Sequence, residues 1–153
     1  MNHEKFDKTI MDMAHCMAKM SNCVKYQVGC IITLDTRIIS TGYNGTPSGY
    51  TNCCDVFLDF DMLTEINRIE HRQWSADFEI HAEMNAIIHA AKHGIHLKGA
   101  VLYCTMQPCH NCLKHIVQSG IVEVLYDTPH GKYTNNTQMM LDLTNVKVRS
   151  LNS

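Results

Sequence analysis

The chain has 153 residues, and 13 Lys and Arg against 15 Asp and Glu give a formal net charge of −2. This length is typical of one domain with one core, so we expect residues 1–153 to form a single domain. The near-neutral charge argues against binding to nucleic-acid backbone, which needs a basic surface. The content of 45% hydrophobic and 18% charged residues fits a globular protein and argues against disorder.

No apolar run approaches the roughly 18 residues of a membrane span, so we expect no membrane contact. Residues 1–9 are polar, which predicts no secretory signal and a cytoplasmic protein. In a secreted protein the 8 Cys would indicate disulfides. Here two of them form a C-x-x-C with His close by, which favours metal ligation in a reducing compartment.

The first half of the chain predicts a helix, a β-hairpin, a loop and a second helix. Apolar residues recur at spacings of three and four between Phe6 and Met20, as on one face of a helix. Asp35 and Thr36 separate two apolar runs and suit a hairpin turn. The predicted elements are a helix over 3–20, strands over 28–34 and 37–41, a Gly-, Pro- and Asn-containing loop over 42–55 and a helix over 61–74.

The second half alternates helices and strands. Gly94 suits the end of one helix, and Pro108 suits the start of another. The predicted elements are helices over 83–93, 108–120 and 137–143 and strands over 100–105, 121–127 and 146–148. Such alternation predicts parallel strands, with helices covering both faces of the sheet.

Two short motifs carry the chemistry. His81 and Glu83 form H-x-E, and Pro108, Cys109 and Cys112 form P-C-x-x-C. Together they match the signature of zinc-dependent nucleobase deaminases. One imidazole and two thiolates suit Zn²⁺, and the start of a helix favours thiolates. Three protein ligands leave the fourth tetrahedral position open for water, as a catalytic zinc requires.

Glu83 follows a metal ligand closely without being one, so its carboxylate is placed to act as a general acid and base. A second interpretation is that the C-x-x-C forms a structural zinc knuckle and that His81 is an ordinary helix residue. The joint occurrence of both motifs disfavours chance, and a knuckle has no use for a free carboxylate beside an open metal position.

The chain resembles the deoxycytidylate (dCMP) deaminases of tailed phages, within the cytidine deaminase-like superfamily. Three segments carry the resemblance: Gly42-Tyr43-Asn44-Gly45-Thr46-Pro47-Ser48-Gly49, His81-Ala82-Glu83-Met84-Asn85-Ala86-Ile87 and Pro108-Cys109-His110-Asn111-Cys112. The resemblance implies an α/β fold, a three-layer α/β/α sandwich around a five-stranded mixed sheet. It also implies zinc-dependent hydrolysis of dCMP to dUMP, which supplies thymidylate synthesis, in the host cytoplasm if a phage encodes the chain.

Family members are usually homo-hexamers that dCTP activates and dTTP inhibits, and a triphosphate effector could bring Mg²⁺. The resemblance places Asn44 and Tyr126 at the substrate. It places Asn44, Gly45, Gly49 and Lys92 at the nucleotide or effector site, where the phage relatives carry Arg in place of Lys92. From the residues alone, Asn44-Gly45 also suits a tight turn, Tyr126 suits core packing and Lys92 suits a solvated helix face.

Phage relatives also carry a structural zinc. The positions that match its ligands are Cys23, Cys53, His71 and Glu79. Four protein ligands would fill all four coordination positions of the zinc, as in structural sites. The alternative is that Cys23 and Cys53 are small buried hydrophobic residues, and Cys54 could replace Cys53 as a ligand.

Two classes of rival function remain. One is a deaminase of free cytidine, guanine or tRNA adenosine; the net charge disfavours the tRNA enzyme, and free-nucleoside enzymes lack the Asn-Gly-x-Pro-x-Gly loop. The other is a non-catalytic, zinc-stapled binding domain.

Overall fold

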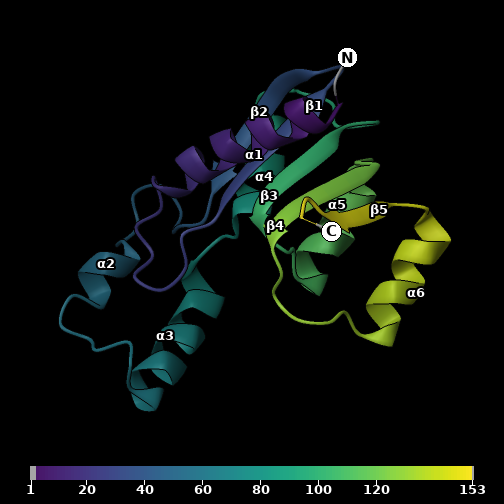
Figure 1. Cartoon of the computed structure of the whole chain (residues 1–153). Coiled ribbons are helices and arrows are strands. Elements are labelled where there is room, and N and C mark those ends of the chain that lie inside the picture. Colours follow the sequence, from purple (N-terminus) through teal and green to yellow (C-terminus); the bar gives the residue numbers. More distant parts are fainter. Residues whose placement is uncertain (1–2, 153) are drawn as a thin grey trace.

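The computed structural model describes residues 3–152 and shows helices packed against both faces of one mixed sheet (Figure 1). The helices are α1 (His3–Ala18), α2 (Cys53–Val56), α3 (Glu65–Phe78), α4 (Ala82–Lys92), α5 (His110–Gln118) and α6 (Asn135–Thr144). The strands are β1 (Gly29–Leu34), β2 (Arg37–Tyr43), β3 (Val101–Met106), β4 (Glu123–Thr128) and β5 (Lys147–Ser150). The predicted α/β sandwich with a five-stranded mixed sheet is confirmed.

The strand order is β2-β1-β3-β4-β5. β1 runs antiparallel to β2 and β3, while β3, β4 and β5 are parallel, as the alternation of the second half predicts. The β1–β2 hairpin turns at Asp35 and Thr36, both in the left-handed region with φ of 48° and 65°. Positive φ at both turn residues is typical of the tight turn that matches strand twist.

Each face of the sheet has its own core. Ile31 faces α1 and its neighbour Ile32 faces α4, because successive side chains of a strand point to opposite sides. The α1 face packs Ile10, Met11 and Ala14 against Ile31, Tyr103 and Leu125. The opposite face packs Ala86 and Ala90 of α4, Leu113 and Ile116 of α5 and Leu141 of α6 against Ile32, Leu102 and Val124. Among residues 3–152, no helix combines the length and apolar character that crossing a bilayer requires.

Two glycines allow helices to lie directly on the sheet. A Cβ on Gly29 would stand 2.0 Å from the carbonyl oxygen of Ala14 in α1, and one on Gly42 would stand 2.3 Å from that of Ala82 in α4. These distances are far below contact between carbon and oxygen, so any side chain would push the helix away. Gly42 therefore lets the start of α4, which carries the H-x-E motif, pack closely against β2.

Several boundaries differ from the prediction. The predicted loop 42–55 contains the short helix α2. α3 begins later than predicted, because Thr64 caps it by accepting a hydrogen bond from the Asn67 N–H at 3.3 Å, and it also ends later, at Phe78. α5 begins after Pro108, because Cys109 has extended backbone and occupies the N-cap position.

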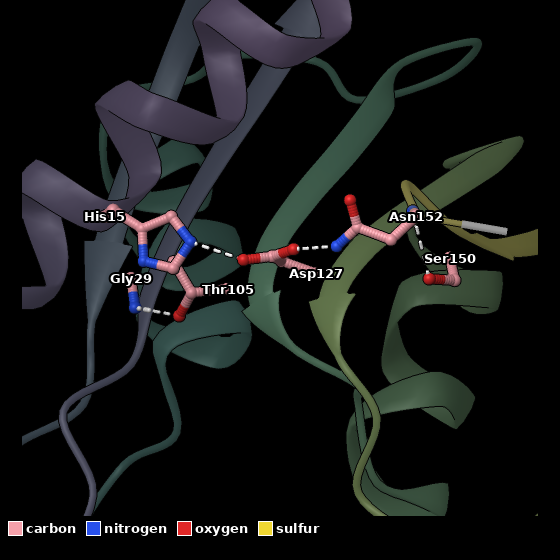
Figure 2. Close-up of polar contacts among 6 residues, drawn as sticks. All are labelled: His15, Gly29, Thr105, Asp127, Ser150 and Asn152. Carbon is pink, nitrogen blue, oxygen red and sulfur yellow. Dashed lines mark hydrogen bonds and ion pairs between the residues drawn. The ribbon is translucent and has the colours of Figure 1, made fainter.

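Polar contacts connect neighbouring segments at the edge of the sheet where β3 and β4 end and β1 begins (Figure 2). The Gly29 N–H donates to Thr105 Oγ1 at 3.1 Å, which joins the start of β1 to the end of β3. His15 Nε2 lies 2.8 Å from one carboxylate oxygen of Asp127, and the Asn152 side-chain amide donates to the other. α1 and the C-terminal segment are thus tied to the edge from which the loops of the candidate site begin.

Candidate active site and metal centres

Two helix N-termini meet at this edge and bring the two sequence motifs together. His81 is the N-cap residue of α4 and Cys109 is that of α5, and neither side chain caps its own helix. Both side chains therefore remain available for a ligand. The partial positive charge at the two helix starts favours anionic groups such as thiolates.

The geometry of this cluster suits Zn²⁺. His81 Nδ1 lies 3.4 Å from the Sγ of Cys112 and 3.7 Å from the Sγ of Cys109. Zinc–ligand bonds of about 2.0–2.3 Å at tetrahedral angles place S and N ligand atoms about 3.6 Å apart. The three ligand atoms lie within 4.8 Å of one another, so one metal ion fits between them.

Hydrogen bonding within the cluster prepares a thiolate. The Cys112 thiol donates to Cys109 and is the main cause that lowers the pKa of Cys109 to about 3. The same contact, together with burial, raises the pKa of Cys112. The hydrogen bond to Cys109 raises the pKa of His81. The cluster therefore holds negative charge on sulfur, which is the form that binds a metal.

Glu83 lies in the first turn of α4 beside the cluster and is not one of its three ligands. It is 4% exposed, and burial is the main cause that raises the pKa of its carboxyl group. A general acid and base works best when its pKa is close to the working pH. Burial therefore moves the pKa of Glu83 in the direction that suits proton transfer near neutral pH.

A cavity of about 420 Å³ opens beside His81, Glu83 and Cys109. It lies at the carboxyl ends of β3 and β4, where open α/β sheets bind their ligands. Pockets of this size accommodate small molecules such as nucleotides. Asn44, Gln107 and His130 contribute to other parts of its wall.

A second buried cluster lies beside the same cavity. His71 Nε2 is 3.5 Å from the Sγ of Cys23 and 3.3 Å from the Sγ of Cys53, again close to the ligand spacing of zinc. Cys54 is outside the cluster, and its thiol lies 3.8 Å from a carboxylate oxygen of Asp55. The structure thus brings Cys53, and not Cys54, to His71.

Glu79 faces this second cluster. One of its carboxylate oxygens accepts a hydrogen bond from Ser75 Oγ at 2.6 Å. The other, Oε1, is buried and has no hydrogen-bond partner among the described residues. Burial is the main cause that raises the pKa of Cys53 to about 12, and the Glu79 charge raises it further. Two buried thiols, an imidazole and an unpaired carboxylate oxygen make a donor set that suits a cation.

The glycine-rich loop borders a separate cavity of about 270 Å³, which includes Gly45 and Gly49. Asn44 and Glu79 line both cavities. The amide group of Asn44 is engaged with the segment before β1: its oxygen accepts from the Val28 N–H, and its nitrogen donates to the Tyr26 carbonyl, both at 2.8 Å. Asn44 thus supports one wall of the first cavity through backbone contacts.

Two predicted residues lie elsewhere. Tyr126 is on β4, outside the described lining of either cavity. Lys92 is exposed in the last turn of α4 and also lies outside both linings. Along an 11-residue helix it stands roughly 15 Å from the metal-binding end.

Among the lining residues of the first cavity that the sequence analysis missed, five carry charged, amide or aromatic side chains: Lys25, Tyr26, Arg72, Gln107 and His130. Gln107 Oε1 accepts from the His130 N–H at 2.8 Å, and the Tyr26 and His130 rings meet edge to face. These contacts join the segment before β1 to the loop after β4 across the cavity. None of the five lies in a motif, although Lys25 and Arg72 lie close in sequence to predicted metal ligands.

Comparison with known proteins adds independent information. Residues 4–128 match the family described as "Cytidine and deoxycytidylate deaminase zinc-binding region". A "Deoxycytidylate deaminase" of Enterobacteria phage T4 is 36% identical over 151 residues, covering 81% of this chain and 78% of the relative. One of Schizosaccharomyces pombe is 36% identical over 146 residues, covering 94% and 43%. The crystal structure of dCMP deaminase from the cyanophage S-TIM5 in complex with dCMP and dUMP has a TM-score of 0.74 at 31% identity, covering 95% and 96%.

Proposed function

The chain belongs to the cytidine and deoxycytidylate deaminase family, and we propose that it hydrolyses dCMP to dUMP and ammonia. One observation carries the proposal. A three-ligand His-Cys-Cys cluster and a buried carboxylate outside it share the wall of a nucleotide-sized cavity. The phage and cyanophage relatives named for dCMP support this substrate over other pyrimidines.

His81, Cys109 and Cys112 would hold the catalytic zinc. When bound, Zn²⁺ supplies a Lewis acid that makes water nucleophilic near neutral pH. Glu83 takes a proton from the attacking water and delivers it to N3 of the cytosine ring. The water oxygen bonds to C4, and Glu83 then takes the remaining proton of that oxygen and transfers it to the amine. The bond between C4 and the amine nitrogen breaks, ammonia leaves and C4 becomes a carbonyl carbon.

The test is incubation of the purified protein with dCMP, CMP, deoxycytidine, dCTP, guanine and tRNA while the deaminated product of each is measured. The expected result is deamination of dCMP with a higher kcat/KM than deoxycytidine. Preference for a free nucleoside, or turnover of guanine or tRNA adenosine only, would assign another deaminase. No turnover of any of these by zinc-loaded protein would favour the non-catalytic binding domain.

We further propose a second, structural zinc held by Cys23, Cys53, His71 and Glu79. The ligand spacing and the unpaired Glu79 oxygen support it. This ion would join the segment before β1, α2 and α3, which are otherwise connected by few buried apolar residues. Elemental analysis of fresh protein should find two zinc ions per chain, and a single ion would remove the second site.

We propose that dCTP activates and dTTP inhibits the enzyme, with Mg²⁺ accompanying the triphosphate. The second cavity supports a nucleotide site distinct from the first, built on Asn44, Gly45 and Gly49. Gly45 and Ile80 exchange two backbone hydrogen bonds of 3.1 and 2.8 Å, which connects that loop to the residue before His81. Lys92 remains a proposed effector residue. Hyperbolic dCMP kinetics that neither triphosphate alters would contradict this regulation.

We propose a homo-oligomer, a hexamer by family resemblance, acting in the cytoplasm as one domain over residues 1–153. The exposure of α3 supports self-association. His71 is its one buried residue, whereas Ile66 is 76% exposed and Leu63, just before the helix, is 85% exposed. Apolar side chains exposed together mark interaction surfaces. Light scattering coupled to size exclusion measures the subunit number, and a monomeric mass at micromolar concentration would contradict the oligomer.

A further inference from the structure

We propose that His89 and His93 form a further metal site, which takes a divalent transition metal ion that imidazole binds well, such as Ni²⁺, Zn²⁺ or Cu²⁺. His89 lies in the last turn of α4 and His93 is the C-cap residue, and neither belongs to the two clusters described above. Measured along the helix from His81, they stand roughly 12 and 18 Å from the catalytic cluster. The inference is independent of the proposed deamination.

The spacing of the two histidines places their side chains on one face of the helix. Residues four apart on an α-helix are neighbours, and two such imidazoles can bind one ion. The ring centroids lie 4.5 Å apart, with 51° between the ring planes. An ion about 2.0–2.1 Å from one nitrogen of each ring lies about 3.2 Å from each ring centre, so bond angles of about 90–110° place the centres about 4.5–5.2 Å apart. The observed separation falls at the short end of that range.

Both imidazoles are available to a ligand. The two side chains are exposed, and within residues 3–152 their contact with each other is the interaction that each ring makes. By contrast, Nδ1 of the exposed His115 lies 2.6 Å from the Asn111 carbonyl oxygen. A neutral imidazole keeps one nitrogen lone pair, and this ligand suits Zn²⁺, Ni²⁺ and Cu²⁺. The pair therefore offers two nitrogen ligands to one ion.

The local charges act in both directions. The backbone carbonyl groups at the end of α4 carry partial negative charge, which favours a cation. The ammonium group of Lys92 opposes the cation, but Lys92 is exposed, so water and salt screen its charge. Water completes the coordination of an ion held by two imidazoles, so we expect weaker binding than at the thiolate clusters. A bound ion would connect the last turn of α4 to its C-cap and oppose fraying of the helix that carries Glu83.

The experiment titrates Ni²⁺ into untagged protein whose two thiolate clusters hold zinc. Isothermal titration calorimetry should show one Ni²⁺ bound per chain. His89→Gln and His93→Gln should each weaken that binding at least about 10-fold, because one imidazole cannot chelate. The double variant should abolish the binding. His115→Gln is the matched control and should bind Ni²⁺ like wild-type protein, because His115 is exposed but has no histidine four residues before or after it.

Thermal unfolding gives a second measurement that needs no substrate. Saturating Ni²⁺ should raise the Tm of the wild-type and His115→Gln proteins and leave that of the double variant unchanged. Without Ni²⁺ the double variant should unfold near the wild-type temperature, since both side chains are exposed. Ni²⁺ that replaced cluster zinc would release zinc and bind the double variant equally well, which would overturn the assignment. Equal Ni²⁺ affinity and equal Tm shifts in wild-type and double-variant proteins would also overturn it.

Discussion

Replacing Glu83 by Gln removes the proton-transferring group and little else. The amide has the size and hydrogen-bonding shape of the carboxyl group but cannot accept the proton of water. The side chain is 4% exposed and lies outside the His81–Cys109–Cys112 cluster. Zinc content, melting temperature and dUMP binding should therefore stay near wild-type values.

The expected loss of kcat follows from the position of Glu83. A single general acid or base typically contributes a factor of about 10² to 10⁴. Of the two carboxylates in the described lining of the first cavity, Glu79 faces the second cluster, so Glu83 has to perform the several proton transfers. Its burial keeps bulk water from replacing it. We expect a loss near the upper end, about 10⁴ in kcat, which is about 5 kcal/mol of activation free energy.

The assay is the single-turnover and steady-state conversion of dCMP to dUMP with zinc-loaded protein. Glu70→Gln, an equally conservative change at an exposed position of α3, is the control and should keep full activity. Cys109→Ala should instead lose zinc and activity together, because a thiolate ligand is gone. If Glu83→Gln kept more than about a tenth of wild-type kcat, the carboxylate would account for less than about 1.4 kcal/mol, and its assigned role would be wrong.

Three further predictions concern stability. Cys53→Ser should remove one zinc per chain by elemental analysis and lower the melting temperature, whereas Cys54→Ser should do neither. Gly42→Ala should lower the free energy of unfolding in urea by about 1–3 kcal/mol, because the added Cβ would overlap the backbone of α4. An unchanged unfolding midpoint would contradict that packing. Tyr103→Phe removes the hydroxyl that donates to the buried Asp7 carboxylate at 2.7 Å and should cost about 1.5–3 kcal/mol in the same measurement.

The sequence by itself determined the features that depend on neighbours along the chain. The Asp35-Thr36 hairpin, the parallel strands of the second half and the H-x-E and C-x-x-C motifs all follow from short-range patterns. Cys109 and Cys112 are three residues apart at a helix start, so one turn of helix already places both sulfurs on one side. That is why the two cysteines of the cluster could be predicted as ligands of one metal without knowledge of the packing, whereas His81 was assigned to them from the joint H-x-E and C-x-x-C signature.

Only the tertiary structure decided which distant residues meet. It brings Cys53 rather than its neighbour Cys54 to His71, and it places Lys25 and Arg72 beside one cavity while the glycine-rich loop borders another. These contacts join segments without regular secondary structure to helices, and packing sets their positions. No periodicity records such packing, because the side chains of an irregular segment can point in any direction until the segment is held against the rest of the chain.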